Sequence, residues 1–245
     1  MNPLSLNLII FCTTMGHAGR HTYKDCINNL YDRVDKNIFK NRLLHLKTRE
    51  GEEDTAEQIK KFCEDKDIRI IETIENIVHH SENHQTHSAG YFKDIYKAYS
   101  DLDIRKQKYS FWLEDDELLQ SSNISLDDAI KKSIDFLDNN PDQLCVRFNR
   151  AEQFKDPDGE FLTENENIFT QSVNYTKYGP TFTFQPNINR TNEIFIAWKA
   201  AQNYLDKLGS YHCELMSGDL LSGLTNSKTP FSFFNTNKAY SKTIG

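Results

Sequence analysis

Long hydrophobic runs are missing from this chain. The longest, at Leu8–Cys12 with its flanks, is far shorter than the roughly 18 to 20 apolar residues that a membrane-spanning helix needs. No basic residue precedes this run, and it leads into Thr13 and Thr14 rather than into a small-residue cleavage site. We therefore expect neither a transmembrane helix nor a secretory signal.

Cysteine is scarce, and positive charge is in deficit. The five cysteines are an odd number without a closely spaced pair, which argues against a disulfide framework and a CxxC zinc site. The 29 Lys plus Arg stand against 36 Asp plus Glu, a net charge of -7, whereas nucleic-acid binding needs a clustered basic face. We expect a reduced, cytoplasmic protein that does not bind nucleic acid as its main function.

The length and composition predict one globular domain. A chain of 245 residues with 38% hydrophobic residues can bury a large core. No internal repeat and no clear linker divides it. We expect a single domain over 1–245, with a nucleotide-binding half over about 1–120 and an acceptor-side half over about 121–245.

The first half alternates apolar, strand-like runs with amphipathic, helical ones. This alternation is typical of an α/β fold, in which helices cover both faces of a mostly parallel sheet. The expected strands are Asn7–Thr13, Arg42–Leu46, Ile68–Ile74 and Lys108–Leu113, and the expected helices are Thr22–Val34, Asp54–Glu64 and Ser88–Tyr99.

The second half mixes strands and helices less regularly. Ser125, with Asp128 three residues later, predicts a capped helix that runs to about Leu137. The polar stretch 150–180 suggests a hairpin or flap with strand character near Ile168–Val173. The further expected elements are strands at Leu144–Phe148, Thr181–Gln185 and after Pro230, and helices at Thr191–Leu208 and Glu214–Leu224.

Four acidic residues follow the strand Lys108–Leu113 directly. In open α/β sheets ligands bind beyond the carboxyl ends of the strands, and Mg²⁺ takes one or two carboxylates together with substrate phosphate oxygens. A solvated acidic turn would have the same composition. The acids are Glu114, Asp115, Asp116 and Glu117.

At these residues the chain resembles the GT-A fold glycosyltransferases, nucleotide-sugar-dependent enzymes of the family-2 type. In that family a first apolar strand leads into a nucleotide-binding loop, and a later strand ends in Asp-x-Asp. Leu6–Thr14 looks like the first element, and Phe111–Asp116 looks like the second, with Glu114 in place of the first Asp. The resemblance implies that Asp116, helped by Glu114 or Asp115, binds Mn²⁺ or Mg²⁺, and that a UDP- or GDP-sugar is the donor.

A second stretch is similar to the family's later motifs. Many members have Gly-Gly-Phe-Asp-Glu and then Glu-Asp at the start of a helix, where the Asp is the base in inverting enzymes. Gly209–Glu214 followed by Ser217–Leu221 looks like a diverged version. The resemblance implies that Asp219 or Glu214 is the catalytic base, with the two roles exchangeable, and His212 is a candidate metal ligand or acceptor contact.

Other candidate ligand-binding residues lie after the early strands. Thr13, Thr14, Gly16 and Arg20 form a small-residue loop before a helix N-terminus, which suits a nucleotide or phosphate as well as an ordinary turn. Arg49 and Glu72 end the second and third strands and are candidate nucleotide contacts.

Two later groups of polar residues leave their role open. Arg190, in the segment Phe184–Arg190, is a candidate diphosphate contact, with capping of, or ion pairing on, the helix that follows it as the alternative. The histidines near 79–87 lack the ligand spacing of a zinc site.

The resemblance predicts a metal-dependent, inverting glycosyltransferase of the hexosyltransferase type, whose acceptor hydroxyl belongs to a glycan, a lipid-linked glycan or a protein. A sugar-phosphate nucleotidyltransferase is one alternative, but Gly16–Arg20 departs from the Gly-x-Gly-x-Arg spacing of that class. A non-catalytic module that binds a glycan or a partner on the same fold is another.

Overall fold

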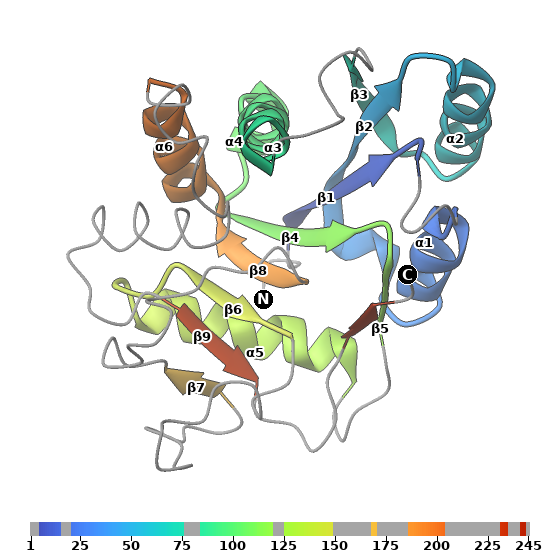
Figure 1. The fold of residues 1–245 in the computed structure, drawn as a ribbon. Helices are drawn as coiled ribbons and strands as arrows, with labels where there is room; N and C mark the ends of the chain where they lie inside the picture. The colour runs from blue at the N-terminus through green and yellow to red at the C-terminus, as the bar shows by residue number, and fades with distance from the viewer. Residues whose placement is uncertain are drawn as a thin grey trace, which may run out of the picture.

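The structure is a computed structural model that describes residues 5–15, 21–75, 84–119, 125–148, 168–170, 186–203, 231–234 and 241–243. Figure 1 shows how its strands and helices are arranged. The strands are β1 (Leu6–Thr13), β2 (Phe39–Arg49), β3 (Arg69–Glu75), β4 (Tyr109–Glu114), β5 (Glu117–Leu119), β6 (Cys145–Arg147), β7 (Ile168–Thr170), β8 (Asn187–Arg190), β9 (Phe231–Phe234) and β10 (Ser241–Thr243). The helices are α1 (Tyr23–Tyr31), α2 (Glu53–Asp65), α3 (His84–Tyr99), α4 (Leu102–Arg105), α5 (Leu126–Asn139) and α6 (Thr191–Gln202), with a 3-10 turn at Lys36–Ile38.

Eight of the described strands form one mixed sheet, in the order β3-β2-β1-β4-β8-β6-β9-β7. The pairs β3-β2, β2-β1, β1-β4 and β6-β9 are parallel, whereas β8 is antiparallel to both β4 and β6, and β7 is antiparallel to β9. All these strands except β8 and β7 therefore run in one direction. The expectation of a mixed, mostly parallel α/β sheet is confirmed. A second, two-stranded sheet pairs β10 with β5.

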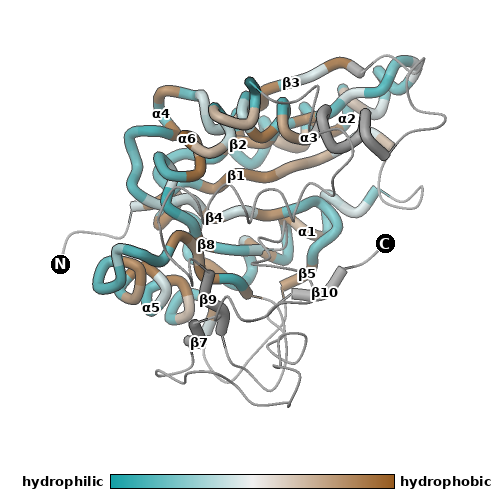
Figure 2. The backbone as a smooth tube through the Cα atoms, turned by 60° about the vertical axis from the view of Figure 1, so that its left-hand side comes forward, coloured by the Kyte–Doolittle hydropathy of each residue, from teal (hydrophilic) through white to brown (hydrophobic). Residues whose placement is uncertain are grey.

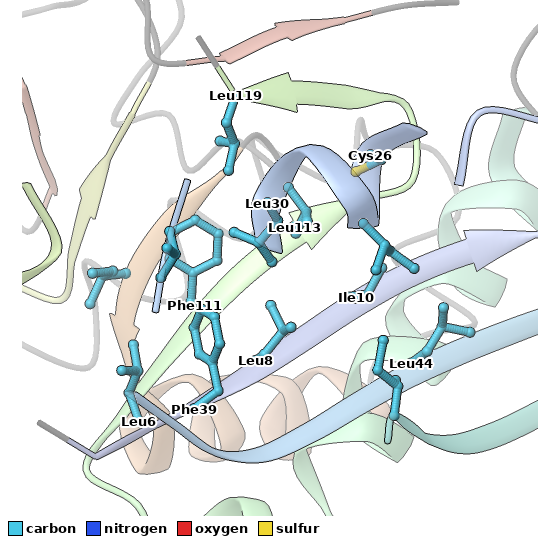
Figure 3. Packing of buried hydrophobic residues seen from close by; sticks show 14 of the residues in the cluster. Leu6, Leu8, Ile10, Cys26, Leu30, Phe39, Leu44, Phe111, Leu113 and Leu119 are labelled. Atoms are coloured by element: carbon cyan, nitrogen blue, oxygen red, sulfur yellow. The ribbon is translucent and has the colours of Figure 1, made fainter. Parts of the chain in front are cut away.

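Helices pack on both faces of the large sheet. On one face Leu8 and Leu113 share a fully buried cluster with residues of α1, α2 and α5, and Figure 3 shows Leu30 and Cys26 of α1 above them. On the other face Trp112 packs with residues of α3 and α6. Figure 1 shows α3, α4 and α6 grouped together, apart from α1 and α2.

The central strands are apolar on both sides because both faces are covered. Residues 6–12 of β1 are all buried, and hydrophobic colours run along β1 in Figure 2. Complete burial of one Leu or Ile side chain stabilises a fold by about 1.5–3 kcal/mol. These strands therefore fix the middle of the sheet and, with it, the point where their carboxyl ends meet.

Local signals place the helix ends. The Ser125 Oγ accepts a hydrogen bond from the Asp128 backbone N–H, as the predicted cap requires, and α5 runs to Asn139. Tyr23, Cys26, Ile27 and Leu30 form the buried face of α1, at helical spacing.

The second half departs from the expectation at Phe184–Arg190. Asn187–Arg190 is a buried strand, β8, inside the large sheet. The expected strand Thr181–Gln185, the expected helix Glu214–Leu224 and most of the 150–180 hairpin lie outside the described residues. None of the helices in the described part of the chain is long and apolar enough to cross a membrane.

Candidate functional site at the carboxyl end of the first four strands

The first four strands of the sheet end along the same edge. Phe11 of β1 pairs with His45 of β2 and with Glu114 of β4, and Thr13 pairs with Lys47. The residues expected to bind nucleotide or metal after β1, β2 and β4 are therefore brought together by the register of the sheet. This edge is where open α/β sheets bind ligands.

The acidic motif is a turn whose backbone is held from two sides. Asp115 donates its backbone N–H to the Phe11 carbonyl at 3.0 Å, which extends the pairing of β4 with β1. The Thr22 hydroxyl, just before α1, donates to the Asp115 carbonyl at 2.8 Å, and the Cys26 thiol donates to the Glu114 carbonyl at 3.1 Å. The motif is thus a fixed part of the sheet edge.

The carboxyl group of Asp115 faces β1. Its Oδ2 accepts the Thr13 backbone N–H at 3.3 Å, it hydrogen-bonds the Cys12 thiol, and the residue is 8% exposed. Burial raises the pKa of Asp115 to about 6, although the hydrogen bonds from Cys12 and Thr13 act in the opposite direction. Asp115 therefore ties the ends of β1 and β4 together.

Asp116 and Glu114 are the other two carboxylates of the motif. Asp116 is buried and lies in the turn between β4 and β5, and Glu114 is half-buried at the end of β4. Among the described residues no three His, Cys, Asp or Glu side chains gather as a metal site. Mg²⁺, however, is usually held by one or two carboxylates, with substrate phosphates and water completing its shell, and Glu114 and Asp116 fit that set.

Thr14 joins the loop after β1 to the end of β2. Its backbone N–H donates to the Lys47 carbonyl, and its hydroxyl accepts the Arg49 backbone N–H, both at 3.0 Å. Thr14 is completely buried. The half-buried Arg49 has a buried Nε with no hydrogen-bond partner among the described residues.

Glu72 lies within β3, three residues before the strand ends, and faces α2. Its carboxylate accepts the Thr48 hydroxyl at 2.5 Å and pairs with Lys60 at 3.0 Å. Burial raises the pKa of Glu72, but these two contacts outweigh burial and hold the pKa below its ordinary value. The structure therefore places Glu72 in a half-buried ion pair with Lys60 of α2 and does not bring it to the acidic motif.

The structure does not bring Arg190, the candidate diphosphate contact, to this edge. Arg190 pairs with Tyr109, the first residue of β4, so it lies about 16 Å along the strand from Glu114. Arg190 is 7% exposed, and its guanidinium donates to the Leu137 and Asn140 carbonyls at the C-terminal end of α5 and, at 2.8 Å, to the carbonyl of Gln143 in the loop after that helix. The capping alternative is the better one, although the helix that Arg190 caps is α5 and not the helix that follows it.

The remaining candidates lie outside the described residues. They are Gly16, Arg20, His212, Glu214 and Asp219. Their roles stay predictions.

The sequence reasoning missed a buried arginine at the far side of the same edge. Arg147 ends β6, pairs with Asn187, and is completely buried. Asn187 in turn pairs with Trp112, two residues before Glu114. The available signal was a charged residue inside the expected apolar strand Leu144–Phe148.

Comparisons with known proteins identify the fold. No family model matches the chain, and no curated protein matches it. The structure resembles S. aureus TarS 1–349 in complex with UDP, with 12% identity, a TM-score of 0.51, and coverage of 96% of this chain and 60% of that one. It also resembles GalNAc-T7 with UDP, GalNAc and Mn²⁺, with 9% identity, a TM-score of 0.51, and coverage of 94% of this chain and 42% of that one.

A third similar structure is a putative glucose-1-phosphate thymidylyltransferase from Bacillus anthracis in complex with a sucrose. It has 7% identity, a TM-score of 0.50, and coverage of 94% of this chain and 87% of that one. At such identities the likeness shows the fold alone. The chain has a GT-A fold like that of nucleotide-sugar glycosyltransferases, and it spans about 60% of the TarS structure.

Proposed function

We propose that the chain is a metal-dependent glycosyltransferase, which moves a sugar from a nucleoside-diphosphate sugar to an acceptor hydroxyl with inversion at the anomeric carbon. The observation that carries this proposal is the motif Glu114–Asp116 at the carboxyl end of β4, fixed beside the end of β1 in a GT-A fold. We further propose one domain over 1–245, with the donor site in about 1–120 and the acceptor side in about 121–245.

Asp116 and Glu114 are the residues that would hold Mn²⁺ or Mg²⁺, with His212 as a further proposed ligand. A divalent cation bound there would supply Lewis-acid stabilisation of the departing diphosphate. The likeness to GalNAc-T7, solved with UDP and Mn²⁺, supports this proposal.

The donor would lie along the ends of β1 and β2. Thr13 and Thr14, at the end of β1, would receive the nucleotide together with Gly16 and Arg20, and Arg49 at the end of β2 would be a further contact. We propose a UDP- or GDP-sugar. Asp115 would hold this loop and the metal-binding turn at a fixed separation through its bond to Thr13.

The acceptor side would supply the base. Asp219 or Glu214 would take the proton of the acceptor hydroxyl as its oxygen attacks the anomeric carbon. The bond from that carbon to the diphosphate oxygen breaks with its electron pair, and the nucleoside diphosphate leaves. The acceptor would be a glycan, a lipid-linked glycan or a protein.

A second candidate, a sugar-phosphate nucleotidyltransferase, is favoured by the likeness to the thymidylyltransferase, most of whose length is covered. That enzyme class would bind a nucleoside triphosphate with a sugar 1-phosphate and release pyrophosphate. A non-catalytic glycan-binding module is the remaining alternative.

Ligand-dependent thermal unfolding tests these proposals. A panel of nucleoside di- and triphosphates and their sugars is added, with and without Mn²⁺, to the wild type, to Asp116→Asn, and to Asp135→Asn as a control on the exposed face of α5. A ligand at a hundred times its Kd stabilises the native state by about 2.7 kcal/mol. We expect Mn²⁺-dependent stabilisation by UDP or GDP that is lost only in Asp116→Asn.

Other outcomes favour the alternatives. Stabilisation by triphosphates alone, with pyrophosphate released from a sugar 1-phosphate, would favour the nucleotidyltransferase. Absence of any nucleotide effect on the wild type would favour the binding module.

A further inference from the structure

Helix α1 begins without the side-chain cap that its sequence offers. Thr22 occupies the N-cap position of α1, where a threonine hydroxyl ordinarily accepts a backbone N–H from the first turn of the helix. The Thr22 side chain makes no such bond, and its backbone torsion angles lie in the helical region rather than in the extended region usual for a cap. A cap of this kind normally stabilises a helix, so the hydroxyl serves a different contact.

The Thr22 hydroxyl is bonded to the acidic motif instead. It donates to the Asp115 carbonyl at 2.8 Å, and Thr22 is 8% exposed. That carbonyl belongs to the peptide group that joins Asp115 to Asp116. Because a peptide group is planar, a hydrogen bond to its oxygen restrains the whole plane. The bond therefore fixes the backbone from which the Asp116 carboxylate extends.

Two further side chains of α1 hold the same segment. The Cys26 thiol donates to the Glu114 carbonyl at 3.1 Å, and the Glu117 backbone N–H bonds to the same sulfur. The Asn29 Oδ1 accepts the Leu119 backbone N–H at 2.7 Å. We call the three side chains that make these contacts the α1 stripe: Thr22, Cys26 and Asn29.

The α1 stripe lies along one face of its helix, since its members are four and three residues apart. All its contacts to the segment 114–119 are with backbone groups. The stripe is made of a hydroxyl, a thiol and an amide, and burial raises the pKa of the Cys26 thiol well above its ordinary value, so that the thiol stays protonated. It therefore acts on the shape of the acidic motif without adding a charge beside the carboxylates.

A bound divalent cation is sensitive to this kind of positioning. Mg²⁺ requires nearly octahedral ligand geometry at about 2.0–2.1 Å, and hydrogen bonds behind the ligands keep them in place. Loss of one such bond typically costs about 10–100-fold in metal affinity. The α1 stripe restrains the backbone at both proposed ligands, through the Glu114 carbonyl and through the peptide that precedes Asp116.

We propose that Thr22 is a positioning residue of the metal site, whose hydroxyl holds Asp116 in the geometry that binds the cation. The proposal rests on the proposed function, since it requires Mn²⁺ or Mg²⁺ at Asp116.

Titration of the full chain with Mn²⁺, in the presence of UDP or GDP, tests the role of Thr22. Electron paramagnetic resonance measures the free ion for the wild type, Thr22→Val and Thr22→Ser. The valine keeps the shape of the side chain and removes its hydroxyl, whereas the serine retains the hydroxyl. We expect Thr22→Val to raise the Kd of Mn²⁺ about tenfold or more and Thr22→Ser to keep the Kd of the wild type.

Ser100→Ala is the matched control. The Ser100 hydroxyl also donates to a backbone carbonyl, that of Tyr96, at 2.6 Å. It lies at the opposite end of the sheet, because the next residue, Asp101, pairs with Arg69 at the start of β3. We expect the control to lower the free energy of unfolding and to leave the Kd of Mn²⁺ unchanged. If Thr22 served stability alone, Thr22→Val would behave like this control.

The possible failures are distinguishable. If the wild type binds no Mn²⁺ with either diphosphate, the proposed function itself is contradicted. If the wild type binds Mn²⁺ and Thr22→Val binds it equally well, or if Thr22→Ser weakens binding as much as Thr22→Val does, only the role of the Thr22 hydroxyl is refuted. Circular dichroism checks folding, and Thr22→Ala, which removes the hydroxyl and leaves a smaller side chain, decides by the same criterion if the valine variant does not fold.

Discussion

The buried imidazole of His45 should make folding sensitive to mild acid. His45 is 1% exposed, and its Nε2 lies 3.0 Å from the Thr73 hydroxyl. The nearby Asp94 would favour a protonated ring, but burial and the two lysines Lys97 and Lys47 outweigh it and lower the pKa of His45 to about 3. The ring therefore folds in its neutral form.

The size of the effect follows from the two pKa values. In the unfolded chain His45 titrates near 6.5, so the unfolded state takes up the proton first as the pH falls. The stability that neutral His45 contributes is complete above that value and is lost progressively toward pH 3. Between pH 8 and pH 5 the loss amounts to about 2 kcal/mol, at 1.36 kcal/mol per pH unit below the unfolded pKa.

Urea unfolding at pH 8, 7, 6 and 5, followed by circular dichroism, measures this loss against His45→Gln. The glutamine is neutral throughout and retains an amide that can bond Thr73. We expect the stability of the wild type relative to the variant to fall by about 2 kcal/mol from pH 8 to pH 5. Asp115, with a pKa of about 6, favours folding as the pH falls, but it is common to both proteins and cancels. A difference that stays constant from pH 8 to pH 5 would refute the reasoning.

Three further predictions concern the frame around the site. Arg190→Met should lower the free energy of unfolding by about 3 kcal/mol or more, because carbonyls at the end of α5 and in the loop after it lose a buried charged donor. Nucleotide affinity should stay unchanged, and weaker affinity at unchanged melting temperature would contradict this. Thr14→Val should lower the free energy of unfolding, measured by chemical denaturation, by about 1–2 kcal/mol, since the Arg49 backbone N–H loses its acceptor. An unchanged denaturation midpoint would count against that hydrogen bond. Ser125→Ala should lower the free energy of unfolding by about 1 kcal/mol through the lost α5 cap, whereas Ser125→Thr should retain most of the stability. Equal losses of stability in both variants would show that the cap is not the cause.

The parts of the fold that were predicted correctly carry local signals. β1 and β4 are continuous apolar runs, and α5 begins at a serine cap, so each can be recognised without its neighbours. The acidic motif was placed at a strand end because the apolar run stops at Leu113. Short-range patterns of this kind need no knowledge of strand order.

The segment Asn187–Arg190 shows where such reasoning fails. Arg190 in this segment was a candidate diphosphate contact, yet the segment forms a buried strand. The Asn189 side chain accepts the Tyr99 hydroxyl at 3.1 Å and donates to Asn187 at 2.9 Å. Because these asparagines bond to each other and to a residue 90 positions away, no local pattern identifies them as core.

The sequence by itself determined where the strands end and that carboxylates follow β4, because hydrophobic runs and the charges that interrupt them are local properties. Only the tertiary structure decided which charged side chains share that edge. The register of β1 with β2 places Lys47 beside Thr13, whereas the antiparallel pairing of β8 with β4 carries Arg190 to the opposite end. The Asp115 carboxyl turns toward Thr13 because β1 lies next to β4, and strand order is set by long-range packing, which no stretch of sequence contains.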